Sequence, residues 1–300
     1  MSELGKIKKI AKKSVILSML YKFLMPKLIG NFVFSPLSYA VSLHFKKKYS
    51  FKKIDSYFKT DLIFCVGSGK SLDEIDLNNI RNSTVILLNG SVLRYKDFQG
   101  RGNSLVWFAQ DVLRIIDYVE YVPESIPKII TLDRWRHLPK LIGKLDANSD
   151  VFFQPKVSFR YMLGSNIKDY QGLKSILPAY KEIGSSDSDV ALKNGSFLIC
   201  PKTVMLTSLY LALQYRPRKI ITLGFDVPEN ADSRSYIKNG FGGKLKDKDK
   251  VSSFPHDIIS KYQVDFLGCA RKKGVKVFNA SPLTSEKTFD KIECINKVYE

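Results

Sequence analysis

The sequence predicts an α/β fold of the Rossmann-like type: a mostly parallel sheet flanked by helices, with a basic helical extension at the N-terminus. After residue 60, short apolar runs alternate with helix-like segments, and the first of these runs end in small or polar turn residues. Lysine is crowded into the first sixty residues, which predicts the extension. Parallel sheets of this kind bind ligands beyond the carboxyl ends of their strands.

The composition is that of a globular protein with a strong positive charge. Of its 300 residues, 44% are hydrophobic and 26% are charged, which is ordinary for a folded chain. Lysine and arginine total 48 against 29 acidic residues, so the formal net charge is +19. Such a charge favours polyanions, but it does not choose between nucleic acid, anionic lipid and a charged glycan, and a merely solvated basic face is the alternative.

The cysteines predict neither a zinc site nor a disulfide framework. Cys65, Cys200, Cys269 and Cys294 form no CxxC motif and no short cluster with histidine. Cys65 and Cys200 stand in apolar runs, which is typical of buried, small hydrophobic residues. A reducing cytoplasm fits this pattern.

Residues 1–60 are predicted to be a basic amphipathic segment that associates with a membrane. Aliphatic and aromatic residues lie between its lysines, so a helix can lie in the plane of the lipid headgroups. Each lysine near an anionic surface adds about 1 kcal/mol to binding. Lys22, Pro26 and Lys27 interrupt the apolar stretch, so no spanning helix is expected. The alternative is a helical layer packed on the core, with its lysines in water.

Residues 61–300 are predicted to form one α/β domain. The expected helices are Thr203–Gln214 and Tyr262–Lys273. The expected strands are Leu62–Val66, Thr84–Leu88, Ser104–Phe108, Lys128–Leu132, Asp150–Phe153, Lys219–Leu223 and Val275–Asn279.

A glycine turn follows the first expected strand. It consists of Gly67, Ser68 and Gly69, with Ser71 just beyond it. It lacks the first glycine of a P-loop and the third glycine of a dinucleotide fingerprint. Asn89 ends the second strand, where a dinucleotide-binding fold would carry an acid. The pattern predicts either a turn that lets the backbone approach a ligand or a plain tight turn.

Four positions in the C-terminal half are further candidates. Thr203 stands at a helix start, where backbone amides favour a phosphate, or it is an ordinary N-cap. Asp226 follows a strand and either holds a sugar hydroxyl, orients a loop or forms an Asx turn; Tyr236 lies in the loop after it. His256, in a polar loop before the last helix, is suited to take a proton near neutral pH, although a lone histidine is more often structural. No acidic cluster suggests a metal.

In their order along the chain, these short motifs resemble those of the bacterial sialyltransferases of glycosyltransferase family 42, which use CMP-activated sialic acid. The family's G-N-G-P-S-L loop, S-G-I-D-F motif and closing C-P-N-S are similar to Gly67–Leu72, Leu223–Val227 and Ser281–Thr284. Ser68 replaces the family's asparagine, and Pro228 replaces a second tyrosine. The resemblance covers residues 61–285 and is thin between 100 and 194.

The resemblance implies an inverting glycosyltransferase. It would move sialic acid or a similar ulosonic acid from its CMP ester to a cell-surface glycan or glycolipid, as in lipopolysaccharide biosynthesis, with no cofactor beyond the donor. His256 would be the general base. The donor nucleotide would be bound by Gly67, Ser68, Gly69, Ser71, Asn89, Thr203, Asp226 and Tyr236.

The expected location is the cytoplasmic, inner face of the membrane. The partners would be a CMP-sugar, a glycan or glycolipid acceptor and an anionic membrane; nucleic acid is not expected because no known RNA or DNA motif occurs. Homo-oligomerisation stays open. Two alternatives also stay open: a pterin pyrophosphokinase-like phosphotransferase that uses ATP and magnesium, and a non-catalytic, basic membrane-binding module.

Overall fold

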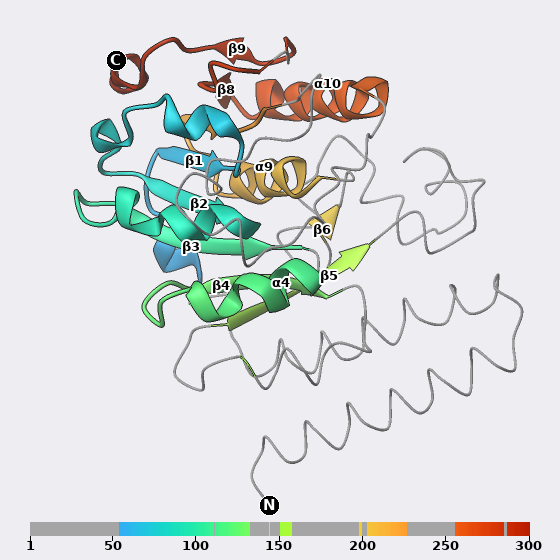
Figure 1. The fold of residues 1–300 in the computed structure, drawn as a ribbon. Coiled ribbons are helices and arrows are strands. Elements are labelled where there is room, and N and C mark those ends of the chain that lie inside the picture. The colour runs from blue at the N-terminus through green and yellow to red at the C-terminus, as the bar shows by residue number, and fades with distance from the viewer. Residues whose placement is uncertain are drawn as a thin grey trace, which may run out of the picture.

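The computed structural model describes residues 54–110, 112–132, 144, 151–157, 198–199, 203–226, 256–284 and 287–300. Within this part of the chain lies a nine-stranded sheet, in the order β6-β5-β4-β3-β2-β1-β7-β8-β9, and every pair of neighbours is parallel (Figure 1). The predicted α/β, Rossmann-like fold is therefore confirmed. The strands are β1 Leu62–Val66, β2 Thr84–Leu88, β3 Ser104–Ala109, β4 Lys128–Leu132, β5 Val151–Val157, β6 Leu198–Ile199, β7 Lys219–Leu223, β8 Lys276–Asn279 and β9 Asp290–Lys291.

Helices cover both faces of the sheet. The α-helices are α4 Val112–Tyr118, α9 Val204–Gln214 and α10 His256–Lys272; the 3₁₀ segments are η1 Asp55–Tyr57, η2 Lys70–Asp73, η3 Leu77–Asn79, η4 Asn89–Phe98, η5 Val119–Tyr121 and η10 Ile295–Tyr299. α4, η4 and η10 pack on one face, and α9, α10 and η1 pack on the other. Successive side chains of a strand point to opposite faces of the sheet. Since helices cover both faces, both sets of side chains in a central strand are buried, and its sequence is a continuous apolar run.

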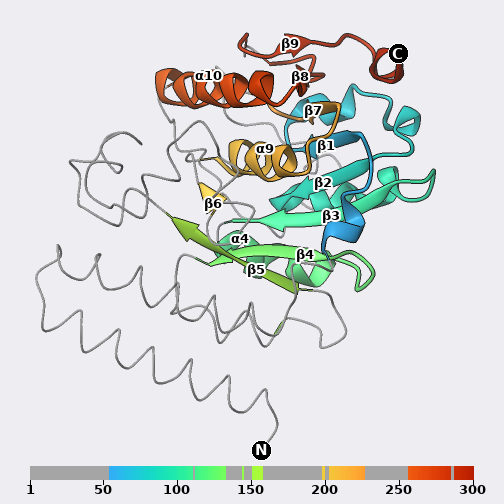
Figure 2. The same ribbon diagram turned by 180° about the vertical axis from the view of Figure 1, so that it is seen from behind.

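β1 lies in the middle of the sheet, and the chain changes direction there. From β1 it moves outward through β2, β3, β4 and β5 to β6, and it then returns to β7 on the other side of β1. Figure 2 shows β1 and β7 side by side between β2 and β8. The gap between β1 and β7 is thus the topological switch point, where open parallel sheets bind their ligands.

β1, β2, β4 and β7 have the bounds that the apolar runs predict, while the last helix differs. α10 begins at His256, not at Tyr262, so His256 is the first residue of the helix and does not lie in a loop before it. Pro255 directly precedes this start, and Ile258, Ile259 and Tyr262 continue the helical period toward the N-terminus.

The folded unit includes residues 54–58, which fall within the predicted extension. Ile54 and Phe58 are buried, and the ring of Phe58 stacks on that of Tyr215 with 4.0 Å between centroids. The hydroxyl of Tyr215 donates to Asp55 at 3.2 Å. Burial, followed by the nearby charge of Asp55, raises the pKa of Tyr215. Residues 1–53 of the predicted extension lie outside the described residues.

Cys65 is a core residue, as its apolar surroundings predict. It is fully buried in β1, and this burial raises the pKa of its thiol to about 12. A thiol of that kind is inert toward nucleophilic chemistry near neutral pH. In the described part of the chain, no helix combines the length and hydropathy that a membrane span requires.

Candidate functional site

The glycine turn lies at the switch point, directly against β7. The backbone N–H of Gly67 donates to the carbonyl of Leu223 at 2.7 Å, and that of Gly69 donates to the carbonyl of Gly224 at 3.1 Å. The turn after β1 thus continues the pairing with β7 beyond the end of the strands. Its backbone is fixed before any ligand arrives.

Only glycine fits at the two ends of this turn. A Cβ added to Gly67 would lie 2.5 Å from the carbonyl oxygen of Gly224, and one added to Gly69 would lie 2.6 Å from the same oxygen. Gly224 itself has a φ of +59°, a conformation that side chains rarely adopt. The glycines therefore allow two segments of the protein's own backbone to approach closely. The approach of a ligand to this turn stays a prediction.

Asp226 is the residue that joins the two turns. One carboxylate oxygen accepts the backbone N–H of Ser71 at 2.8 Å, and the other accepts the hydroxyl of Ser71. Ser71 is fully buried. The structure thus gives Ser71 and Asp226 a positioning function, because they hold the glycine turn against the end of β7; we call this pair the Ser71–Asp226 clamp.

The loop after β8 is fixed to the same clamp. The N–H of Leu283 donates to the Ser71 hydroxyl oxygen at 3.0 Å, and the N–H of Phe225 donates to the hydroxyl oxygen of Ser281 at 2.9 Å. Ser281 is in turn held by Asn279, whose side-chain oxygen accepts its N–H at 3.0 Å. Three neighbouring strands therefore end in loops that share hydrogen bonds.

Asn89 lies at the end of β2, on the other side of β1. Its φ is +47°, and its carbonyl oxygen accepts the indole N–H of Trp107 at 2.9 Å. The hydroxyl of Ser91 accepts the N–H of Leu88 and donates to the carbonyl of Val66, each at 2.7 Å, so the ends of β1 and β2 are joined. The side-chain oxygen of Asn89 is buried without a hydrogen-bond partner among the described residues. Such an orphaned oxygen is unusual and marks a site that a ligand donor can satisfy.

Thr203 is the N-cap of α9. Its side-chain oxygen accepts the N–H of Leu206 at 3.1 Å, which is the ordinary capping bond that the sequence allowed. One turn later, the hydroxyl of Thr207 contacts the side-chain oxygen of Gln110, at the end of β3, at 3.2 Å. The start of α9 is thereby fixed at the carboxyl edge of the sheet, with its first free amides directed there.

The remaining candidates are described less fully. Ser68 is half-buried, and its side chain has no hydrogen-bond partner in the described part of the chain. His256 starts α10, but only its backbone is described, and Tyr236 lies outside the described residues. Within the same limits, no group of three or more histidine, cysteine or acidic side chains is arranged to bind a metal ion.

Sequence reasoning missed Ser91 and gave no role to Gln110. Nothing in the sequence distinguishes Ser91 from other serines of a turn, because its partner Val66 is 25 positions away. Ser281 was found only as part of a resembling motif, without its contact to Phe225.

Comparison with models of protein families finds no match, and comparison with curated protein sequences finds none either. Among solved structures, the chain matches the sialyltransferase CstII from Campylobacter jejuni, described in complex with a substrate analogue, cytidine-5'-monophosphate. The identity is 13%, the TM-score is 0.40, and the match covers 77% of this chain and 84% of that chain. Such a distant likeness assigns no function, so the function proposed below rests on residues of this chain.

The close approach at Gly67 predicts a strong effect on stability. Gly67→Ala should lower the free energy of unfolding by about 1–3 kcal/mol, because the new methyl group meets a backbone oxygen that cannot move independently. Urea unfolding would measure the change. The matched control is Gly268→Ala in α10, where the added Cβ meets nothing within 4 Å; it should stabilise the helix by up to about 1 kcal/mol. Equal stabilities of the two variants would contradict this account of the turn.

Proposed function

We propose that the protein is a glycosyltransferase that moves an acidic sugar from its CMP ester to a glycan or glycolipid. The observation that carries the proposal is the Ser71–Asp226 clamp, which fixes a glycine turn at the switch point of a parallel sheet. Asn89, with its unsatisfied side-chain oxygen, ends the neighbouring strand β2. The same ordered residues carry the resemblance to the family 42 sialyltransferases.

The proposed donor site uses neutral groups. The glycine turn lets the nucleotide lie close to the backbone, and the side-chain oxygen of Asn89 accepts a hydrogen bond from the nucleoside. The free amides at the start of α9, after Thr203, receive the phosphate, since a helix N-terminus favours an anion. CMP carries a single phosphate, so the proposed donor site includes no metal ion.

The proposed reaction is a direct displacement with inversion. The acceptor hydroxyl attacks the anomeric carbon of the donor sugar, and the bond from that carbon to the phosphate oxygen breaks. CMP departs with the bonding electrons. His256 takes the proton of the acceptor hydroxyl, and Thr203 and Tyr236 donate hydrogen bonds to the departing phosphate, whose negative charge grows in the transition state. A membrane-bound acceptor would account for the basic, apolar start of the chain.

The nucleotide is tested first. CMP or CDP should raise the melting temperature without added metal, because a ligand that binds only the folded state stabilises it. Asn89→Gly removes the side chain but tolerates the positive φ, and it should weaken CMP binding by about five- to tenfold, the worth of one hydrogen bond. The control Asn296→Gly changes an exposed residue of η10 and should leave the affinity unchanged. A response to ATP with magnesium, and none to cytidine nucleotides, would favour a phosphotransferase instead.

The catalytic step is tested at His256. His256→Ala should lower turnover of a CMP-activated acidic sugar by about 10²–10⁴-fold, the usual contribution of a general base, and leave CMP affinity nearly intact. The control is His137→Ala. If the His256 variant keeps full turnover, the proposed mechanism is wrong.

Membrane binding is tested in the full-length chain by removing lysines. Changing Lys6, Lys8, Lys9 and Lys12 to glutamine should weaken sedimentation with anionic vesicles by well over tenfold, at about 1 kcal/mol for each lysine. Salt should partly release the wild type, because it screens surface charges. The matched control changes Lys244, Lys246, Lys248 and Lys250 and removes the same charge. Equal losses in both variants would mean that net charge, not the N-terminal segment, drives binding.

A further inference from the structure

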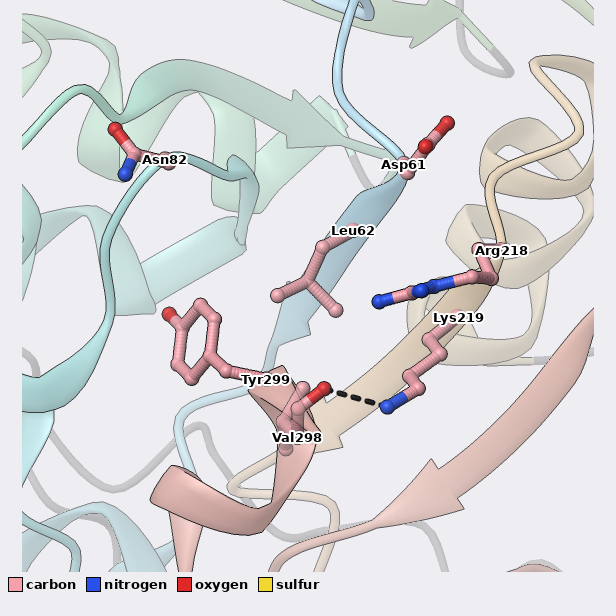
Figure 3. A pocket seen from close by; sticks show the side chains of 7 residues that line it. All are labelled: Asp61, Leu62, Asn82, Arg218, Lys219, Val298 and Tyr299. Carbon is pink, nitrogen blue, oxygen red and sulfur yellow. Dashed lines mark hydrogen bonds between the residues drawn. The ribbon is translucent and has the colours of Figure 1, made fainter.

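A cavity lies at the opposite edge of the sheet from the glycine turn. It has a volume of about 180 Å³ and is lined by Asp61, Leu62, Asn82, Arg218, Lys219, Val298 and Tyr299 (Figure 3). β1 runs from Leu62 in this cavity to Val66 beside the glycine turn, so the two sites are separated by the length of a strand. At about 30 Å³ for each water molecule, the cavity has room for a small anion with some of its hydration.

Positive charge is concentrated around this cavity in an unfavourable arrangement. Leu62, Lys219 and Lys276 are direct neighbours in the register of β1, β7 and β8, so the two lysines lie next to each other on one face of the sheet. Like charges at directly paired positions destabilise a sheet. Arg218 precedes Lys219 and also lines the cavity. A bound anion would turn this repulsion into attraction.

Lys219 responds to this environment. Its ammonium donates to the carbonyl of Val298 at 2.7 Å, which leaves two of its three donors. Its pKa is lowered mainly by burial, and then by the charges of Arg218 and Lys276, while Glu300 acts in the opposite direction. The cavity is therefore a place where positive charge is only partly compensated.

Arg218 is directed toward the cavity. In Figure 3 its guanidinium extends across the cavity beside Leu62, with the ring of Tyr299 on the far side, and the carboxylate of Asp61 points away from it. The guanidinium has no hydrogen bond or ion pair to another described side chain. The hydroxyl of Tyr299 is already paired with the backbone of Arg81, which fixes this wall.

We infer that this cavity binds a phosphate group through the guanidinium of Arg218 and the ammonium of Lys219. Guanidinium matches phosphate oxygens with two parallel N–H donors, and ammonium adds a compact charge. The phosphate belongs either to a soluble phosphate compound or to the headgroup of an anionic lipid. The site is independent of the donor site and does not require the proposed transferase activity.

The test measures inorganic phosphate binding to the full-length protein by calorimetry, at constant ionic strength maintained with chloride. Arg218→Gln should weaken the affinity about tenfold or more, since a bidentate, charge-assisted contact is lost. Arg218 is exposed, so the variant should fold normally. Lys287→Gln removes the same charge from an exposed position near β9 and should bind phosphate as the wild type does. Asn89→Gly should also bind phosphate normally, which separates this cavity from the donor site.

Two results would overturn the inference: no measurable binding of phosphate to the wild type, or equal affinity in wild type and Arg218→Gln. If the site is confirmed, vesicles of phosphatidylcholine with and without phosphatidic acid distinguish the source. A selective loss of phosphatidic acid binding in Arg218→Gln identifies a lipid headgroup, and unchanged vesicle binding identifies a soluble phosphate compound.

Discussion

The carboxylate of Asp226 accepts two hydrogen bonds from Ser71, and the geometry of the carboxyl edge depends on this contact. It links residues that are 155 positions apart in sequence. The contact crosses the topological switch point, the only place in the described sheet where the chain returns to add strands on the other side of β1. Hydrogen bonds to a charged group are worth roughly twice those between neutral groups. A clamp of this strength allows the glycine turn to approach the backbone of Gly224 so closely that no side chain fits between them. Rigidity at this edge is thus obtained from the protein alone, without a ligand.

The central strands could be predicted because both faces of the sheet are covered. β1 reads Leu-Ile-Phe-Cys-Val, an apolar run that ends sharply at Gly67, and its bounds follow from that contrast. β9 could not be predicted, since Asp290–Lys291 is a two-residue strand with both side chains exposed and no pattern. β6 is equally short. No local sequence pattern indicates the order of the strands in the sheet, so only the structure shows that β7 lies beside β1.

At the site, the sequence predicts where residues lie along the chain, and the structure adds what they contact. Gly67, Gly69 and Asp226 were found because each follows a strand. Whether Asp226 holds a ligand or the protein cannot be read locally, because Ser71 belongs to a different loop. Thr203 is the opposite case. Its capping bond to Leu206 lies within one helical turn, so the sequence alone could offer it as one of the two possibilities.

The carboxyl and amino edges of the sheet favour charges of opposite sign, and the direction of the helices explains the difference. In a parallel α/β unit the helices run against the strands, so α9 and α10 start at the carboxyl edge and end at the amino edge. Backbone amides at helix starts favour an anion without fixed cations, whereas helix ends favour basic side chains. Arg216, after α9, and Arg271 and Lys272, in the last turn of α10, are accounted for in this way. Lys219 is only partly accounted for, because its ammonium donates to Val298 near the end of η10 but also lies on a strand face directly beside Lys276. The positive charge at the amino edge therefore exceeds what the fold requires, and that excess is what a bound phosphate would neutralise.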